Sequence, residues 1–217
     1  MNRNKNVLLV TGGSVDMKLL RDYYDSNNDL YVVGVDKGLE SLDKALIMPD
    51  LVIGDFDSAC DSIRTIYASS AGAIVLNTEK DYSDTHAAIV EVLKLNPEHI
   101  TIIGGTGTRI DHMLGTIGLL KFCLKNGVKA EVIDNNNRIR IIDKEITITK
   151  KSQYGKYVSC VAFSDIVEGL TIKGFKYDVF DMTLTNDDTI GVSNELREEE
   201  GLISIKKGYL LVFETKD

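Results

Sequence analysis

Short runs of β-branched and other apolar residues alternate with helix-like patterns along the first two-thirds of the chain. The apolar runs predict strands at 7–10, 31–35, 51–53, 73–76, 100–103 and 129–133. Between them, apolar residues recur at helical spacing over 17–24, 39–47, 85–95 and 113–125. Strands that alternate with helices are typical of a parallel sheet covered by helices. The pattern therefore predicts an N-terminal α/β domain.

The pattern changes after the polar run Asp-Asn-Asn-Asn-Arg at 134–138. Beyond it, turn residues separate short strand-like segments, and no segment has the length and spacing of a helix. These segments are 140–149, 157–163, 169–172, 181–185 and 201–213. We therefore predict two domains, an α/β domain at 1–136 and a small all-β sandwich at 139–217.

Polar clusters follow the predicted strands of the first domain at their carboxyl ends, where open parallel sheets bind ligands. The clusters contain Asp36, Asp55, Asp57, Asp81, Asp84, Arg109 and Asp111. Like charges about 4 Å apart repel by roughly 4 kcal/mol at an effective dielectric near 20, so converging carboxylates need a cation. Oxygen ligands without a His or Cys set favour Mg²⁺ over zinc. A single pair is more often a helix cap or a turn, whereas four clusters at successive strand ends favour a metal site.

A glycine-rich turn, Gly-Gly-Thr-Gly at 104–107, follows the strand predicted at 100–103. Glycines let backbone N–H groups approach a phosphate, and Arg109 adds a bidentate donor two residues later. The turn matches neither the P-loop nor the GxGxxG pattern, and a plain left-handed turn between a strand and a helix is the alternative. A lone His at a helix start, such as His112, is more often structural. His86 and His99 have no partner pattern, and we expect no role for them.

The charge balance bears on the class of partner. The 217 residues include 25 Lys and Arg against 33 Asp and Glu, a formal net charge of −8, which argues against nucleic-acid binding. No apolar run approaches the roughly 20 residues of a membrane-spanning helix, and the N-terminus lacks a secretory apolar region. Three cysteines far apart indicate no disulfide framework, and we expect each to be a small core residue. We expect a cytoplasmic protein with no nucleic-acid or membrane partner.

In their order along the chain, these motifs resemble those of the thiamine pyrophosphokinase family. The matching segments are Asp-Lys-Gly at 36–38, Pro-Asp-Leu-Val-Ile-Gly-Asp-Phe-Asp-Ser at 49–58, Lys-Asp-Tyr-Ser-Asp at 80–84, Gly-Gly-Thr-Gly-Thr-Arg-Ile-Asp-His at 104–112 and Ser-Asn-Glu at 193–195. Five motifs in this order are specific together, although none is specific alone. The segment 49–58 is the strongest.

The resemblance implies an N-terminal domain that holds ATP and Mg²⁺, a C-terminal β-sandwich, and a homodimer whose thiamine site lies between subunits. It also implies that the diphosphoryl group of ATP moves whole to the hydroxyl of thiamine, giving thiamine diphosphate and AMP. An anionic enzyme with carboxylates at its site would repel ATP without the metal. Because such transfers have loose transition states, positioning and charge neutralisation matter more than a strong base.

The resemblance also implies roles for individual residues. The implied metal ligands are Asp55, Asp57 and Asp84. The implied ATP-binding residues are Asp36, Gly38, Ser58, Lys80, Ser83, Gly104, Gly105, Gly107 and Arg109. The implied thiamine-binding residues are Asp111, His112, Ser193 and Asn194. Asp84, Asp111 and Arg109 are the expected catalytic residues, with Asp84 or Asp111 as the candidate proton acceptor.

The chain departs from the family pattern at two positions. Thr116 stands where members commonly have Asn, which bears on one polar contact, and Ser83 replaces a frequent Thr. The chain has no Trp, so aromatic packing on thiamine must come from Tyr or Phe, and Tyr177 is the candidate.

Two other classes of function remain open at this point. Asp-Phe-Asp at 55–57 also fits the DxD motif of a magnesium-dependent phosphatase or a sugar-nucleotide transferase. A nucleotide-binding module without enzymatic activity would keep the glycine turn and the carboxylates but turn nothing over. Release of AMP that depends on thiamine would separate the kinase from both alternatives.

Overall fold

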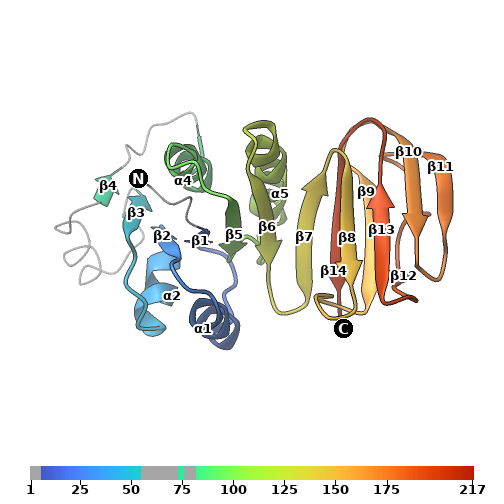
Figure 1. The fold of residues 1–217 in the computed structure, drawn as a ribbon. Coiled ribbons are helices and arrows are strands. Elements are labelled where there is room, and N and C mark those ends of the chain that lie inside the picture. Colours follow the sequence, from blue (N-terminus) through green and yellow to red (C-terminus); the bar gives the residue numbers. More distant parts are fainter. Residues whose placement is uncertain (1–5, 55–72, 76–81) are drawn as a thin grey trace. The chain divides into compact units, whose positions relative to one another are not determined.

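The structure is a computed structural model, and it describes residues 6–54, 73–75 and 82–217 (Figure 1). The chain divides into two compact units, Met1–Asn135 and Asn136–Asp217. An α/β unit is followed by an antiparallel unit, and this order confirms the fold class expected from the sequence. Among the helices of the described residues, none has both the length and the apolar character needed to cross a membrane.

The first unit alternates strands and helices. Its elements are β1 (Val7–Val10), α1 (Met17–Ser26), β2 (Tyr31–Val35), α2 (Gly38–Lys44), β3 (Leu51–Gly54), β4 (Ala73–Val75), α4 (Asp84–Leu93), β5 (His99–Ile103), α5 (Ile110–Lys125) and β6 (Lys129–Ile133). All its strand pairs are parallel, in the order β6-β5-β1-β2-β3-β4. The chain therefore runs outward from β1 through β2, β3 and β4, and it returns on the other side of β1 with β5. This reversal is a topological switch point.

The apolar strand runs explain why this sheet forms. Every residue of β1 is buried, as expected for a parallel strand covered on both faces. Leu8 and Val10 pack with Leu20 of α1 and Leu42 of α2 in one core cluster. Cys123 of α5 is also buried, as we expected. These contacts fix the strand ends from which the polar loops emerge.

The second unit is built from short antiparallel strands. They are β7 (Asn137–Ile142), β8 (Glu145–Thr149), β9 (Tyr157–Ala162), β10 (Ile166–Lys173), β11 (Val179–Thr185), β12 (Asn194–Glu195), β13 (Glu200–Ser204) and β14 (Leu210–Thr215). Antiparallel pairing gives the orders β12-β9-β14-β7 and β11-β10-β13-β8. These strands form a small antiparallel sandwich.

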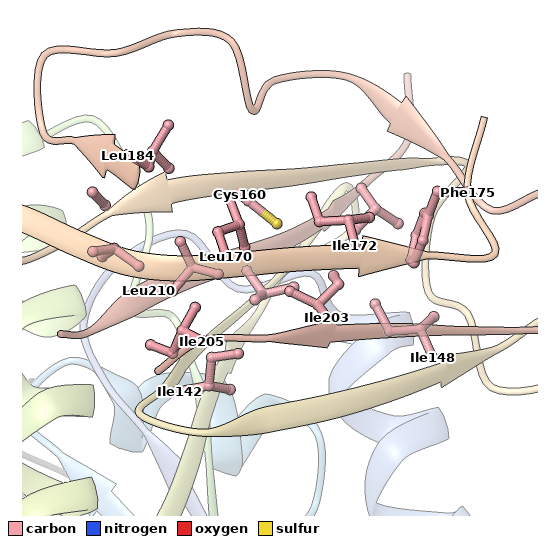
Figure 2. Packing of buried hydrophobic residues seen from close by; sticks show 14 residues of the cluster. Ile142, Ile148, Cys160, Leu170, Ile172, Phe175, Leu184, Ile203, Ile205 and Leu210 are labelled. Atoms are coloured by element: carbon pink, nitrogen blue, oxygen red, sulfur yellow. The ribbon is translucent and has the colours of Figure 1, made fainter. Parts of the chain in front are cut away.

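One apolar core joins the two sets of strands of the second unit (Figure 2). Cys160 of β9 and Leu210 of β14 contribute from one set, and Ile148, Leu170 and Ile203 contribute from the other. Inward-facing residues of two sheets interdigitate in this way in β-sandwiches. The burial of Cys160 fits the core role that we expected for it.

Candidate active site

The loops after β1 and β5 are joined by backbone hydrogen bonds. The N–H of Gly13 donates to the carbonyl oxygen of Gly104 at 2.9 Å, and the N–H of Ser14 donates to that of Thr106 at 2.7 Å. The two strands lie on either side of the switch point, where open parallel sheets bind ligands. The two loops therefore form one connected surface at the place where a ligand is expected.

The glycines of these loops allow the close approach of one backbone to the other. A Cβ atom on Gly13 would lie 2.2 Å from the carbonyl oxygens of both Gly104 and Thr106. Gly104 itself has φ +79°, and a Cβ there would lie 2.3 Å from the carbonyl oxygen of Thr11. The sequence indicated tight turns at both places, at 11–14 and at 104–107, but not that the two turns pair. The available signal was the Gly-Gly pair at 12–13, separated by one residue from the end of β1.

Three backbone N–H groups of the turn after β5 make no backbone hydrogen bond to the described residues. Within the described part of the chain, the backbone hydrogen bonds found do not use the N–H groups of Thr106, Gly107 and Thr108. Helix α5 begins directly after them, and Arg109 at its N-cap gives no side-chain cap. Free N–H groups at the start of a helix attract anions. This surface is chemically suited to phosphate.

Arg109 and Asp111 form a bidentate ion pair at the start of α5. The two bonds are Nη2 to Oδ2 at 2.6 Å and Nε to Oδ1 at 3.2 Å. The guanidinium of Arg109 lowers the pKa of Asp111 to about 2, so this side chain is a carboxylate at neutral pH. Both side chains are about two-thirds exposed, at 67% and 66%. An ion pair this exposed is weak and easily exchanged.

Asp36 and Gly38 follow β2 at the same edge of the sheet. Asp36 has φ +46°, and a Cβ on Gly54 would lie 2.4 Å from its Oδ1 atom. A Cβ on Gly38 would lie 2.1 Å from the carbonyl oxygen of Val10. These close contacts hold the loop after β2 against the ends of β1 and β3. The Asp36 carboxylate therefore lies beside the last residue of β3.

The start of α4 reaches the loop after β1. Thr85 Oγ1 lies 3.1 Å from Thr11 Oγ1 in that loop. Ser83 caps the helix, because its Oγ accepts from the N–H of His86 at 3.3 Å. Asp84 is the first residue of α4 and is half-buried. Ser83 is therefore a helix cap, the alternative that the sequence had left open for this cluster. Asp84 directly precedes Thr85, at the carboxyl edge of the sheet of the first unit.

Thr116, one of the departures from the family pattern, packs against the glycine turn at Gly105. It is buried, and its Oγ1 donates to the carbonyl oxygen of His112 at 2.9 Å in the same helix. A Cβ on Gly105 would lie 2.9 Å from the methyl carbon of Thr116. The hydroxyl is therefore satisfied within α5, and the methyl group packs under the turn. The side chain of His112 is exposed.

The other two histidines have structural surroundings. The ring of His86 lies edge-on between those of Tyr82 and Phe122, with centroid distances of 4.5 and 4.9 Å. His99 Nε2 lies 3.5 Å from Oε1 of Glu131 on the neighbouring strand. Both contacts are made within the first unit, to aromatic rings for His86 and to a carboxylate for His99.

The second unit holds Ser193 and Asn194. Ser193 has φ +64°, its N–H donates to Ser159 Oγ at 3.0 Å, and its side chain is exposed. Asn194 is buried, and its side chain pairs with both backbone groups of Tyr177. Of these two adjacent motif residues, Ser193 thus exposes its side chain to solvent, whereas Asn194 buries its side chain.

Part of the expected site lies outside the described residues. These positions are Asp55, Asp57, Ser58, Lys80 and Asp81. Within the residues that the structure describes, no three His, Cys, Asp or Glu side chains are grouped to hold a metal ion. Asp84 offers the carboxylate oxygens that Mg²⁺ prefers. The donor chemistry of the motif residues therefore fits magnesium, with most of the expected ligands in the segment that follows Gly54.

Two family models match the chain. "Thiamin pyrophosphokinase, catalytic domain" matches residues 24–132, and "Thiamin pyrophosphokinase, vitamin B1 binding domain" matches residues 143–210. The chain is 34% identical to a thiamine pyrophosphokinase of Bacillus subtilis (strain 168) over 98% of this chain and 100% of that protein.

Solved structures agree with these matches. A crystal structure of thiamine pyrophosphokinase from Bacillus subtilis has a TM-score of 0.88 at 34% identity, covering 98% of this chain and 100% of that one. A crystal structure of thiamin pyrophosphokinase from Geobacillus thermodenitrificans has a TM-score of 0.85 at 27% identity, covering 98% of each chain. The similarity thus extends over both units.

Proposed function

The chain belongs to the thiamin pyrophosphokinase family, and on that premise we propose that it works at the carboxyl edge of the first unit's sheet. Its reaction moves the diphosphoryl group of ATP to the hydroxyl of thiamine, and the products are thiamine diphosphate and AMP. The observation that carries the proposed location is the hydrogen-bonded pair of loops at the switch point beside β1.

The triphosphate of ATP binds to the turn after β5. Support comes from the backbone donors of Thr106, Gly107 and Thr108 and from the uncapped start of α5. Arg109 adds a bidentate donor for phosphate oxygens. Gly104 and Gly105 contribute by lacking a Cβ, which allows the backbone of the turn to pack closely against its neighbours. Asp36, Gly38, Ser58, Lys80 and Ser83 complete the proposed nucleotide site.

Phosphate and Asp111 compete for the guanidinium of Arg109. Because the pair is exposed, a triphosphate with several negative charges displaces the single carboxylate. Asp111 then loses the partner that holds its pKa near 2. Nucleotide binding therefore releases a carboxylate whose pKa returns toward its ordinary value, beside the phosphates.

Magnesium is held by carboxylates at this edge. The proposed ligands are Asp84 together with Asp55 and Asp57, which follow Gly54 in the sequence. When bound, the ion supplies positive charge that offsets the repulsion between phosphate oxygens and carboxylates. A chain with a net charge of −8 cannot otherwise hold ATP closely.

The transfer forms one bond and breaks one. The hydroxyl oxygen of thiamine bonds to the β-phosphorus, and the bond from that phosphorus to the oxygen bridging the α-phosphate breaks. AMP leaves with that oxygen and the electron pair, and the hydroxyl proton passes to a carboxylate, Asp111 or Asp84. A loose transition state needs only a weak base. Alignment by Arg109 and the backbone donors therefore matters most.

Thiamine binds with the help of Asp111, His112, Ser193 and Asn194. The exposed hydroxyl of Ser193 supports this role.

We further propose a homodimer in the cytoplasm, where ATP is available. Sedimentation that shows a fully active monomer at assay concentration would exclude the dimer.

Ser193→Ala is expected to raise KM for thiamine more than KM for ATP. An equal effect on both KM values would refute separate binding sites for thiamine and ATP.

The test of the reaction is product analysis. Purified chain with ATP and Mg²⁺ is incubated with and without thiamine, and AMP, thiamine diphosphate and phosphate are quantified by chromatography. We expect AMP and thiamine diphosphate in equal amounts, only when thiamine is present. Free phosphate without thiamine would indicate a phosphatase, and no turnover would indicate a binding module.

Asp57→Asn tests the metal ligands in the same assay. Loss of the carboxylate is expected to abolish turnover while the circular dichroism spectrum stays unchanged. Asp43→Asn is the matched control, because Asp43 is an exposed carboxylate on α2. Normal activity of Asp57→Asn would remove Asp57 from the metal site.

A further inference from the structure

Lys37 stands directly after β2, between two residues of the proposed nucleotide site, Asp36 and Gly38. Its backbone lies against the loop after β1, because a Cβ on Gly12 would lie 3.3 Å from the Cβ of Lys37 and 3.6 Å from its backbone nitrogen. A Cβ on Gly38 would likewise lie 2.9 Å from the backbone nitrogen of Thr11. Glycine at these two positions therefore lets the loop after β2 pack closely on the loop after β1.

Backbone hydrogen bonds hold the segment around Lys37 in place. The N–H of Asp36 donates to the carbonyl oxygen of Ile53 in β3 at 3.1 Å. The carbonyl oxygen of Lys37 accepts from the N–H of Glu40 in α2, also at 3.1 Å. The loop after β1, on which this segment packs, is joined through the N–H of Gly13 to the turn after β5. The base of the Lys37 side chain is therefore fixed beside the loops that carry the proposed triphosphate site.

The ammonium group of Lys37 forms no ion pair with the residues that the structure describes. Its side chain is exposed, and the neighbouring carboxylate of Asp36 has its Oδ1 beside Gly54, where a Cβ would lie only 2.4 Å away. Lys44, on the helix that follows, is instead paired with Glu40 at 3.9 Å. In a chain with 33 acidic and 25 basic residues, Lys37 thus keeps its charge available for an anionic ligand.

We propose that the ammonium group of Lys37 binds phosphate oxygens of ATP. The inference rests on the proposed function and adds a second cation to its nucleotide site. In the strand order, β1 lies between β5 and β2, so the triphosphate crosses the loop after β1 with Arg109 on one side and Lys37 on the other. Arg109 must first exchange Asp111 for phosphate, whereas Lys37 has no such partner among the described residues. A lysine ammonium is a compact charge on a flexible stem, and it binds phosphate without a fixed geometry.

The first test is the binding of ATP to Lys37→Gln, measured by calorimetry with Mg²⁺ and without thiamine. Kd for ATP is expected to rise roughly three- to tenfold, the size of an exposed charge-assisted contact. KM for ATP should rise by the same factor, and KM for thiamine at saturating ATP should not change. Lys37→Arg retains the charge and should bind ATP nearly as the wild type does.

Lys44→Gln is the matched control, because it removes the same charge from an exposed lysine of α2. It reports the effect of net charge alone, and its Kd for ATP should stay close to that of the wild type. Equal Kd values in Lys37→Gln and Lys44→Gln would overturn the inference.

The second test asks whether Lys37 acts on the phosphates. Inorganic triphosphate carries these groups without the nucleoside, and its inhibition constant against ATP should rise in Lys37→Gln by the same factor as Kd for ATP. Sodium chloride screens exposed ionic contacts, so Kd for ATP should depend less on salt in Lys37→Gln than in the wild type. An unchanged inhibition constant or an unchanged salt dependence would show that Lys37 does not bind phosphate.

The wild-type enzyme separates failure of this inference from failure of the proposed function. If the wild-type chain releases no AMP in the presence of thiamine, the proposed function fails. If it does, and Lys37→Gln binds ATP as tightly as Lys44→Gln, only the role of Lys37 fails. Thermal unfolding of each variant identifies effects that come from lost structure.

Discussion

Gly13 has no functional atom of its own, yet the candidate site depends on it. Its N–H donates to Gly104, and any Cβ would lie 2.2 Å from two carbonyl oxygens of the loop after β5. Gly13→Ala must therefore push the loops apart. We expect a loss of about 1–3 kcal/mol in the free energy of unfolding, as for overpacked sites, measured by urea denaturation, with AMP release falling as well.

Gly118→Ala is the control for this substitution. Gly118 lies within α5, and a Cβ there would meet nothing within 4 Å. An alanine in an open helical position is expected to raise the free energy of unfolding by up to about 1 kcal/mol. If Gly13→Ala were as stable and as active as Gly118→Ala, close approach of the two loops would not matter to the site.

The ion pair between Arg109 and Asp111 predicts a pH dependence with a definite sign. Arg109 holds the pKa of Asp111 at about 2, below the ordinary 3.8. The pair therefore stabilises the fold above the ordinary pKa, and this contribution disappears as pH falls through the folded-state value. In Arg109→Gln, the pKa of Asp111 should rise toward 3.8, which a ¹³C carboxyl titration by NMR measures directly.

Asp16 provides the internal reference for that titration. Its pKa is lowered by the backbone N–H of Leu19 and by Asn135, and neither involves Arg109. Its titration is therefore expected to be the same in Arg109→Gln and in the wild type. If the pKa of Asp111 stayed near 2 in the variant, another group would have to hold the carboxylate.

Single positions also mark the limit of prediction from sequence. The motifs identified Ser83 and Asn194, but a motif does not say where a side chain points. The structure turns the Ser83 hydroxyl to its own helix and the Asn194 amide to Tyr177. The Ser83 cap joins residues three apart in the sequence, so it has a local signal. Asn194 is seventeen residues away from its partner, and a contact of that kind leaves no local signal.

At the level of elements, helix α4 depends on one cap. Ser83 Oγ accepts from the N–H of His86, and Ser83→Ala is expected to cost about 1 kcal/mol in urea denaturation. Ser83→Thr keeps the hydroxyl and should lie close to the wild type. Ser26→Ala, at the end of α1, serves as the control because it removes a hydroxyl from no cap. Equal stability of Ser83→Ala and Ser26→Ala would show that the cap is unimportant.

The strands of the first unit were predictable and those of the second only in part. Fully buried apolar runs such as β1 are distinctive, because parallel strands are covered on both faces. The segment 140–149 was predicted as one strand, but it forms β7 and β8, which pair with different partners. Only the short polar turn at 143–144 separates them. Strand pairing is nonlocal, so periodicity alone missed this change of sheet.

For the whole molecule, the sequence predicts a domain boundary at the polar run at 134–138, because helical spacing stops after it. The two compact units meet within that run, between Asn135 and Asn136. The convergence of the β1, β2 and β5 loops followed from a general property of parallel sheets. Which atoms touch there did not, because hydrogen bonds between loops depend on the register of neighbouring strands.

The net charge leads to a prediction for the whole molecule. At −8, the chain repels ATP, and a cation could help either by general screening or by bridging carboxylates to phosphates. Screening falls off over about 10 Å at 0.1 M salt and is supplied by any electrolyte. Bridging needs a small divalent ion with oxygen ligands.

Removal of the metal distinguishes these two roles. We expect EDTA to abolish thiamine-dependent AMP release, and added Mg²⁺ to restore it, because carboxylates and phosphates must share one ion. Sodium chloride or spermidine, added at matched ionic strength as the control, screens charge without forming that bridge and should restore nothing. Activity regained with either additive would mean that the carboxylates of the active site do not hold a metal ion, and that the enzyme binds ATP once its long-range field is weakened.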